Sequence, residues 1–328
     1  MKGTVLFGAN NSFSVLPDGQ NLPVRCSLKG KKLKGAEGFY NPLAAGDRVE
    51  WEGDGHGEGS ISALLPRSSL FWRYNEKGKA IQAIAANMEL VLCVSSAGMP
   101  PFRPRFLDRV SLEPVGDGLP FIIVLNKSDL LIDDGVHERL EDYRRVGFEV
   151  LETSVTTGQG IEDLRKRIAG KRSAFVGQSG VGKSSLLNAL EDGLGLKVGE
   201  VCEKYQRGRH TTVAAVMATL SDGQTHVIDT PGFRRLAVRG IDPMSLGACF
   251  PEIKRAQQRC ALGARCRHED EPGCAVAQAV EDGSVHPDRY ESYLRILMEL
   301  EDNPDYGRRK SPGRRSRSYQ EMDEDYDV

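Results

Sequence analysis

The chain has 328 residues, more than one domain usually holds, and this length suggests two or three domains. Its 44 Lys and Arg residues against 46 Asp and Glu give a net charge of −2, so the composition alone does not indicate a nucleic-acid-binding protein. Without an apolar run of the roughly 18 residues that a membrane span needs, and without a signal peptide, we expect a cytoplasmic protein with no membrane partner.

The first 66 residues contain short strand-like segments that are separated by turn residues. The segments cover residues 4–7, 12–16, 22–27 and 47–52. Their number and spacing predict a small all-β barrel or sandwich, and a barrel of the oligonucleotide-binding (OB) type is the form that we expect here. We interpret residues 52–60, EGDGHGEGS, as a flexible acidic glycine loop.

A lysine cluster lies between the predicted strands of this region, in the sequence KGKKLKG. It consists of Lys29, Lys31, Lys32 and Lys34. One interpretation is a solvated hairpin tip, and the other is a patch that contacts the phosphates of RNA bound to the barrel. The sequence leaves both open.

Two apolar runs, LVLCV at 90–94 and FIIVL at 121–125, are typical of parallel strands buried on both faces. The second run leads into NKSD, which is Asn126, Lys127, Ser128 and Asp129. The Asp129 carboxylate can accept hydrogen bonds from the ring N–H and the amino group of guanine, whereas adenine offers no such pair. We expect Asn126 to hold the base and its loop, and the Lys127 stem to pack over the face of the base.

A helix at 135–146, a strand at 149–152 and a helix at 161–168 follow. Before the last helix, Ser154 is placed to let backbone N–H groups meet the guanine carbonyl. The apolar run 174–176 then opens into GQSGVGKSS, which fits the phosphate-loop pattern and not merely a glycine turn. Its residues are Gly177, Gln178, Ser179, Gly180, Val181, Gly182, Lys183, Ser184 and Ser185.

The phosphate loop assigns chemistry to individual residues. Its glycines let backbone N–H groups surround phosphate oxygens, Lys183 reaches the terminal phosphates, and the Ser184 hydroxyl binds Mg²⁺. After the loop comes GRHTT at 208–212, where Thr211 or Thr212 completes the Mg²⁺ shell when the γ-phosphate is present.

A strand at 225–228 is followed by the sequence DTPG. Asp229 can bind Mg²⁺, through water or directly, and the Gly232 N–H can donate to the γ-phosphate. The next residue, Phe233, replaces the glutamine that orients water in Ras-like enzymes, so we expect slow intrinsic hydrolysis. Either His210 or a partner completes the site, and His210 as a plain exposed loop residue is the alternative.

The order of the motifs is also unusual, because NKSD precedes the phosphate loop. We therefore predict a circularly permuted P-loop GTPase domain at 67–239. After it, Cys260, Cys266, His268 and Cys274 form a complete Cys₃His set for a closed, structural Zn²⁺ site within a mostly helical domain at 240–302. A helix is expected at 288–300, and residues 303–328 read as a disordered charged tail.

These motifs resemble those of the bacterial RsgA (YjeQ/YloQ) GTPases over about residues 1–300. The shared features are the permuted order, GxSGVGKSS, RGRHTT, DTPGF and the CxHxxxEPGC segment. Five residues separate Cys260 from Cys266, whereas four are expected in most members, so the loop before Cys266 is expected to be rearranged. The switch histidine of the family, proposed to assist hydrolysis, corresponds to His210.

The resemblance implies a function. It implies an OB barrel, a GTPase domain and a zinc domain that act in late maturation of the small ribosomal subunit, with hydrolysis of GTP to GDP stimulated by that subunit. Expected partners are the subunit and its rRNA, expected cofactors are GTP or GDP, Mg²⁺ and one Zn²⁺, and the protein is expected to be a monomer. The alternative is a nucleotide-gated RNA-binding scaffold with negligible turnover.

Overall fold

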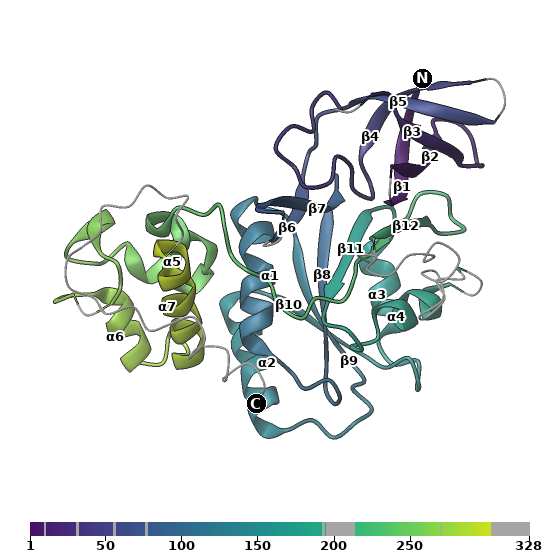
Figure 1. Cartoon of the computed structure of the whole chain (residues 1–328). Coiled ribbons are helices and arrows are strands. Elements are labelled where there is room, and N and C mark those ends of the chain that lie inside the picture. Colours follow the sequence, from purple (N-terminus) through teal and green to yellow (C-terminus); the bar gives the residue numbers. More distant parts are fainter. Residues whose placement is uncertain are drawn as a thin grey trace.

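The computed structural model of the protein describes residues 1–9, 11–30, 33–54, 57–75, 78–191, 194, 214–269 and 271–302. An N-terminal barrel lies above a central sheet covered by helices, and a smaller helical domain lies beside helices α1 and α2 of that central part (Figure 1). No helix in the described ranges is long and apolar enough to cross a membrane.

The N-terminal strands close into a five-stranded barrel. They are β1 (Lys2–Ala9), β2 (Ser12–Pro17), β3 (Val24–Leu28), β4 (Arg48–Gly53) and β5 (Glu58–Leu64). The strand order is β1-β2-β3-β5-β4, with β1 paired to β4 and β3 parallel to β5. This architecture confirms the predicted OB-type barrel.

One expectation for the barrel was wrong, and one of the two interpretations of the lysine cluster is excluded. The predicted glycine loop at 52–60 is shorter, because β5 already begins at Glu58, and Gly59 is a strand residue whose added Cβ would lie 2.7 Å from the Trp51 ring. The lysine cluster is not a hairpin tip, since β3 pairs with β2 and β5 rather than with β4. It opens the long connection from β3 to β4, in which Lys29 forms an ion pair with Glu52 at 2.9 Å. Lys31 and Lys32 lie outside the described residues.

A hairpin that the sequence analysis did not predict joins the barrel to the sheet. It consists of β6 (Leu70–Asn75) and β7 (Ala80–Ala86) and forms its own two-stranded sheet. Isolated bridges tie β7 to the barrel, and Arg67 forms a buried two-point ion pair with Asp47, with both distances at 2.7 Å. These contacts fix the barrel against the GTPase domain.

The central sheet has the order β10-β9-β8-β11-β13-β12 and is parallel except for the edge strand β12. Its strands are β8 (Leu90–Ser96), β9 (Phe121–Asn126), β10 (Glu149–Thr153), β11 (Arg172–Gly177), β12 (Val216–Thr219) and β13 (His226–Asp229). One face packs on α1 (Pro104–Gly116) and α2 (Asp134–Val146), and the other on α3 (Ile161–Ile168) and α4 (Lys183–Leu190). The sequence had indicated α2 and α3 but neither α1 nor β12.

The C-terminal domain has its own apolar core. Its elements are η1 (Pro243–Cys249), α5 (Pro251–Gln257), η2 (Gly263–Arg265), α6 (Ala275–Glu281) and α7 (Pro287–Glu301). Helix α7 begins one residue before the predicted start and buries the expected stripe through Tyr293, Leu297 and Leu300.

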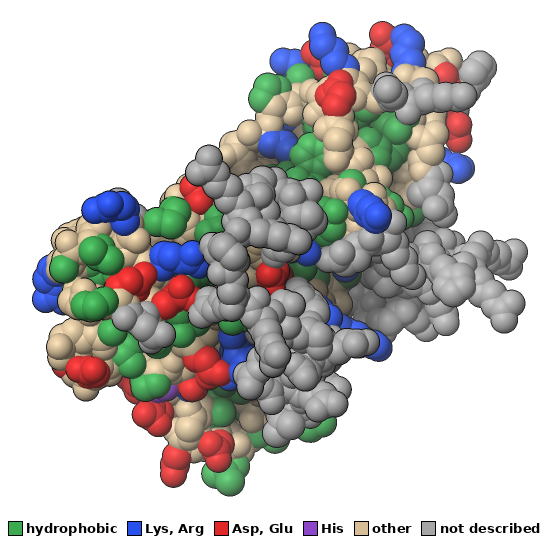
Figure 2. Space-filling view, turned by 60° about the vertical axis from the view of Figure 1, so that its left-hand side comes forward, with side chains coloured by type: hydrophobic (Ala, Val, Ile, Leu, Met, Phe, Trp, Pro, Cys, Tyr) green, Lys and Arg blue, Asp and Glu red, His purple; other side chains and the backbone are tan. Residues whose placement is uncertain are grey.

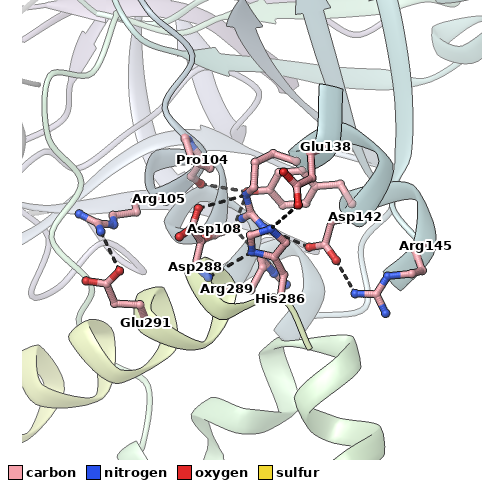
Figure 3. Close-up of polar contacts among 12 residues, drawn as sticks. Pro104, Arg105, Asp108, Glu138, Asp142, Arg145, His286, Asp288, Arg289 and Glu291 are labelled. Carbon is pink, nitrogen blue, oxygen red and sulfur yellow. Dashed lines mark hydrogen bonds and ion pairs between the residues drawn. The ribbon is translucent and has the colours of Figure 1, made fainter. Parts of the chain in front are cut away.

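A buried ion-pair network fastens this domain to the GTPase domain. Arg289 of α7 has no exposed surface and donates to Asp108 of α1 at 2.6 Å and to Glu252 of α5 at 2.8 Å. The Tyr143 hydroxyl of α2 donates to the same Asp108 oxygen at 2.6 Å. Figure 3 shows Arg289 between helices of both domains, together with the more exposed pair Arg105 and Glu291.

Candidate functional site

The phosphate loop lies at the carboxyl end of β11, directly before α4. Its glycines are needed because the loop is packed against neighbouring backbone. A Cβ on Gly177 would lie 2.3 Å from the Val94 carbonyl oxygen, and one on Gly182, where φ is +95°, would lie 2.3 Å from Asn126 Nδ2. The loop is therefore a backbone cradle of the kind that binds phosphate at a helix N-terminus.

Lys183 lies inside this cradle and is only 6% exposed. Its Nζ donates to the carbonyl oxygens of Gly177 at 3.1 Å and Gln178 at 3.0 Å. Burial lowers the pKa of Lys183, while the nearby Asp229 carboxylate opposes this shift. Among the described residues this buried ammonium donates to neutral carbonyls of its own loop, so it is well placed to bind an anion, which offsets its desolvation.

Ser184 and Asp229 form the second part of the site. The Ser184 hydroxyl donates to Asp229 Oδ2 at 2.6 Å. The buried Asp229 Oδ1 has no hydrogen-bond partner in the described part of the chain, and burial raises the pKa of this carboxyl. A hydroxyl next to a carboxylate oxygen without a partner fits Mg²⁺, which prefers hard oxygen ligands and restores the charge balance of a buried carboxylate.

The NKSD residues come from the end of β9, and two of them contact the phosphate loop. The buried Asn126 donates from Nδ2 to the Val181 carbonyl oxygen at 2.9 Å. Lys127, at φ +61°, donates from Nζ to the Gly180 carbonyl oxygen at 3.0 Å and to that of Met99. The base-recognition segment and the phosphate loop therefore form one hydrogen-bonded unit.

The Asp129 carboxylate is held by the side chain of Ser154, which the sequence analysis had linked only to the placement of backbone N–H groups. The Ser154 hydroxyl donates to Asp129 Oδ1 at 2.5 Å and accepts from the Thr157 N–H at 3.1 Å. The Ser128 N–H donates to the Thr153 carbonyl oxygen at 3.0 Å. Ser154 lies 25 positions after Asp129 along the chain, so no local pattern in the sequence could have indicated this contact.

The DTPGF segment lies directly against the phosphate loop. The Phe233 N–H donates to the Gly177 carbonyl oxygen at 3.1 Å, and a Cβ on Gly232 would lie 2.6 Å from Ser179 Cα. The Phe233 ring is 2% exposed and packs edge-on against Phe71, with ring centroids 5.9 Å apart. The ring therefore belongs to the core and does not reach the nucleotide side.

Three predicted site residues, His210, Thr211 and Thr212, lie outside the described residues. Ser185 occupies the first turn of α4 and is partly buried. The other predicted nucleotide-site residues come together at the carboxyl ends of β9, β10, β11 and β13. This is the edge at which parallel α/β sheets bind ligands.

The Cys₃His set forms a compact cluster in the C-terminal domain. Cys260, Cys266, His268 and Cys274 are all buried, and their ligand atoms lie within 4.8 Å of one another. His268 Nδ1 lies 3.6 Å from the Cys260 sulfur and 3.7 Å from that of Cys274. A tetrahedron with Zn–S bonds of about 2.3 Å has edges of about 3.8 Å, so the cluster fits Zn²⁺ closely.

The surroundings of the cluster prepare its ligands for a metal. His268 Nε2 lies 3.3 Å from Gln257 Oε1, which favours the tautomer with a free Nδ1, and burial lowers the pKa of His268. Burial together with the neighbouring thiols raises the pKa of Cys266 to about 12, and a dication would reverse this shift. The 3₁₀ turn η2 accommodates the five residues between Cys260 and Cys266.

A phosphate loop, a guanine-type NKSD motif and a DTPG turn on one edge of a parallel sheet, in permuted order, define a circularly permuted P-loop GTPase. The family model for RsgA GTPase matches residues 64–239. The proteins named small ribosomal subunit biogenesis GTPase RsgA from Borrelia recurrentis and Moorella thermoacetica are 38% and 40% identical to the chain. The alignments cover 93% and 92% of the chain and 96% and 97% of those proteins.

Solved structures agree with this result. The crystal structure of YjeQ from Thermotoga maritima is 31% identical, with a TM-score of 0.69, over 94% of this chain and 99% of that one. The structure of YloQ, a circularly permuted GTPase, is 25% identical, with a TM-score of 0.63, over 94% and 96% of the two chains. The chain belongs to the RsgA GTPase family and is a GTP hydrolase.

Proposed function

We propose that this GTPase acts in the biogenesis of the small ribosomal subunit, binding the subunit and hydrolysing GTP to GDP and phosphate when the subunit stimulates it. The observation that carries the proposal is the alignment with proteins of that name over 93% of the chain, which includes the barrel and the Cys₃His domain as well as the GTPase domain. A relative that shared the GTPase domain alone would not support the same partner.

At the nucleotide, we assign base recognition to Asp129, with Ser154 fixing the orientation of its carboxylate. Asn126 and Lys127 couple the base segment to the phosphate loop, as their bonds to Val181 and Gly180 support. The backbone of residues 177–182, the Lys183 ammonium and the first turn of α4 bind the phosphates, since the loop aims its N–H groups and the helix dipole at one place.

Ser184 and Asp229 would hold Mg²⁺, directly or through water, with Thr211 or Thr212 added when the γ-phosphate is present. When bound, the metal would supply neutralisation of phosphate charge. Gly232 would donate its N–H to the γ-phosphate, and His210 is our candidate for orienting the attacking water, because Phe233 is buried in the core. The four residues of the Cys₃His cluster would hold one structural Zn²⁺.

Exposed basic side chains on both flanking domains support contact with rRNA. The described ones on the zinc domain are Lys254, Arg255, Arg259 and Arg265, and on the barrel Arg25, Lys29 and Lys34. Figure 2 shows Lys and Arg side chains at the barrel end of the molecule and along the opposite edge of the same face. Basic side chains on two separate domains can contact phosphates at more than one place on a structured RNA.

We further propose that residues 1–66, 67–239 and 240–302 are the three working domains, and that the protein acts as a cytoplasmic monomer. The cytoplasmic location is inferred from the proposed partner, the small ribosomal subunit.

The test is GTP turnover with purified small subunits, large subunits or neither. Wild type is compared with His210→Ala and with Lys183→Ala as the inactive control. We expect stimulation by small subunits alone, abolished in Lys183→Ala, while the His210→Ala rate decides the role of that side chain. Equal, very slow turnover in every mixture would contradict the proposal and favour the nucleotide-gated scaffold.

A further inference from the structure

The segment after the DTPG turn passes from one domain core to the next within two residues. The Leu236 side chain packs in the core of the GTPase domain, and the Val238 side chain packs in the core of the zinc domain. Both side chains are buried. Any displacement of this segment therefore affects both cores.

Two charged side chains hold the backbone at this crossing. Arg109 of α1 donates from Nη1 to the Leu236 carbonyl oxygen at 3.3 Å and to Glu299 Oε2 of α7 at 2.5 Å. The other carboxylate oxygen of Glu299 accepts from the Val238 N–H at 2.9 Å. The side chains of Arg109 and Glu299 are only 11% and 6% exposed, so these charge-assisted bonds are shielded from water.

The stretch from Leu236 to Val238, where the chain passes between the two cores, follows the nucleotide site closely in the sequence. Phe233 is bonded to the phosphate loop through the Gly177 carbonyl, and only Arg234 and Arg235 lie between Phe233 and Leu236. Segments that contact a γ-phosphate change position when it is lost. A change at the DTPG turn must therefore be absorbed within two residues or reach the backbone that Arg109 and Glu299 hold.

We propose that Arg109 and Glu299 form a positioning pair, which we call the clamp, that transmits the nucleotide state from the DTPG turn to helix α7 and hence to the zinc domain. The clamp holds backbone groups, so it responds to the position of the segment rather than to its side chains. Because such coupling is reciprocal, a surface that fixes the zinc domain also biases the DTPG turn. The ribosomal consequence rests on the proposed function, whereas the coupling itself rests only on the proposed contact of Gly232 with the γ-phosphate.

Variants of the clamp can be compared with a matched control. Glu299→Gln keeps an oxygen for the Val238 N–H and the side-chain volume but removes the charge that Arg109 needs, and Arg109→Gln removes the other partner. Arg105 and Glu291 join the same two helices at 3.0 Å with side chains 31% and 44% exposed, and their described contacts do not include the linker (Figure 3). Arg105→Gln is therefore the control. Zinc content and thermal unfolding verify that each variant is folded.

The first measurement needs no partner. Hydrogen exchange of η1 and α7 amides is compared in the full-length protein with Mg²⁺ and either GDP or a nonhydrolysable GTP analogue. We expect the two nucleotides to change protection by at least about fivefold in wild type and Arg105→Gln, and by less than about twofold in both clamp variants. If the difference survives in the clamp variants, or is absent from wild type, the coupling proposal is wrong.

The second measurement adds the subunit. The ratio of small-subunit affinities in the two nucleotide states should fall toward one in the clamp variants, while affinity for the free nucleotides stays at the wild-type value. Wild type that shows the exchange difference but neither binds small subunits nor is stimulated by them would refute the proposed function and leave the clamp intact. An unchanged ratio in both clamp variants would refute the clamp and leave the proposed function intact.

Discussion

Replacing Arg289 with methionine should detach the zinc domain from the GTPase domain in a pH-dependent way. Arg289 is wholly buried, and although burial by itself lowers the pKa of its guanidinium, Asp108 and Glu252 raise the pKa above its ordinary value. Arg289→Met has a similar length but leaves both carboxylates buried without a cation. Removing one partner of a buried ion pair lowers the free energy of unfolding by about 3 to 5 kcal/mol.

Protonation of the buried carboxyl groups limits this loss of stability and makes it depend on pH. A carboxyl group with an unfolded-state pKa of about 4 takes up a proton at pH 7 for about 4 kcal/mol, and for about 2 kcal/mol at pH 5.5. In the variant, we expect the folded-state pKa of at least one of these carboxyl groups to be raised. The variant is therefore most stable at low pH, and its free energy of unfolding falls as pH rises above about 4. The destabilisation should therefore shrink by about 2 kcal/mol per protonated carboxyl between pH 7 and 5.5.

The assay is hydrogen exchange of the α7 amides, converted to opening free energies at both pH values for wild type and variant. A second variant, Arg289→Met with Asp108→Leu and Glu252→Leu, should recover most of the loss. Asp108 Oδ2, Glu252 Oε2 and Arg289 Nη2 have no hydrogen-bond partner among the described residues, so the ion network is incompletely satisfied and an apolar replacement loses little. A cost for Arg289→Met below about 1 kcal/mol, or one that does not change with pH, would refute this reasoning.

Four further outcomes are expected. Lys183→Ala should lower GTP affinity by at least about tenfold in fluorescence titrations, with the melting temperature nearly unchanged, because among the described residues its ammonium donates to neutral loop carbonyls. Asp129→Asn should weaken the binding of GTP and favour the binding of a xanthine nucleotide, whose carbonyl accepts a hydrogen bond from the new amide. An equal loss of affinity for both nucleotides would argue against contact between residue 129 and the base. Removing Zn²⁺ with a chelator should unfold the C-terminal domain, seen as lost exchange protection in α6, and added Zn²⁺ should restore it. Burial lowers the pKa of His226 from 6.5, so the β12 to β13 pairing should weaken as pH falls below that value, and exchange of the β12 amides should lose this dependence in His226→Gln.

The sequence predicted those features that repeat locally. The barrel strands β1 to β4, the buried runs of β8 and β9, and the glycine pattern of the phosphate loop each follow from short-range periodicity or turn chemistry. The prediction failed for β5 because Gly53, Gly55, Gly57 and Gly59 suggested a loop. Only the tertiary contact with Trp51 explains why Gly59 lies in a strand.

Contacts between distant segments could not be predicted. The Ser154 hydroxyl that orients Asp129 and the Asp108 carboxylate that receives Arg289 are polar groups whose partners lie 25 and 181 residues away. Helix α1 was missed because Pro114 lies inside it, which argues against a helix, and because several of its polar residues face another domain rather than solvent. In each case the partner, and not the local sequence, defines the role.

Helix α1 also determines which fragments of the chain can fold. Its Leu112 is 1% exposed and packs in the core of the C-terminal domain, while Asp108 and Arg109 of the same helix bind residues of α7. A fragment that ends at residue 239 would contain every nucleotide motif, yet it would expose this apolar surface and remove the α7 partners of Asp108 and Arg109, namely Arg289 and Glu299. The segment that carries the enzymatic motifs is thus shorter than the smallest piece of the chain that should be soluble on its own.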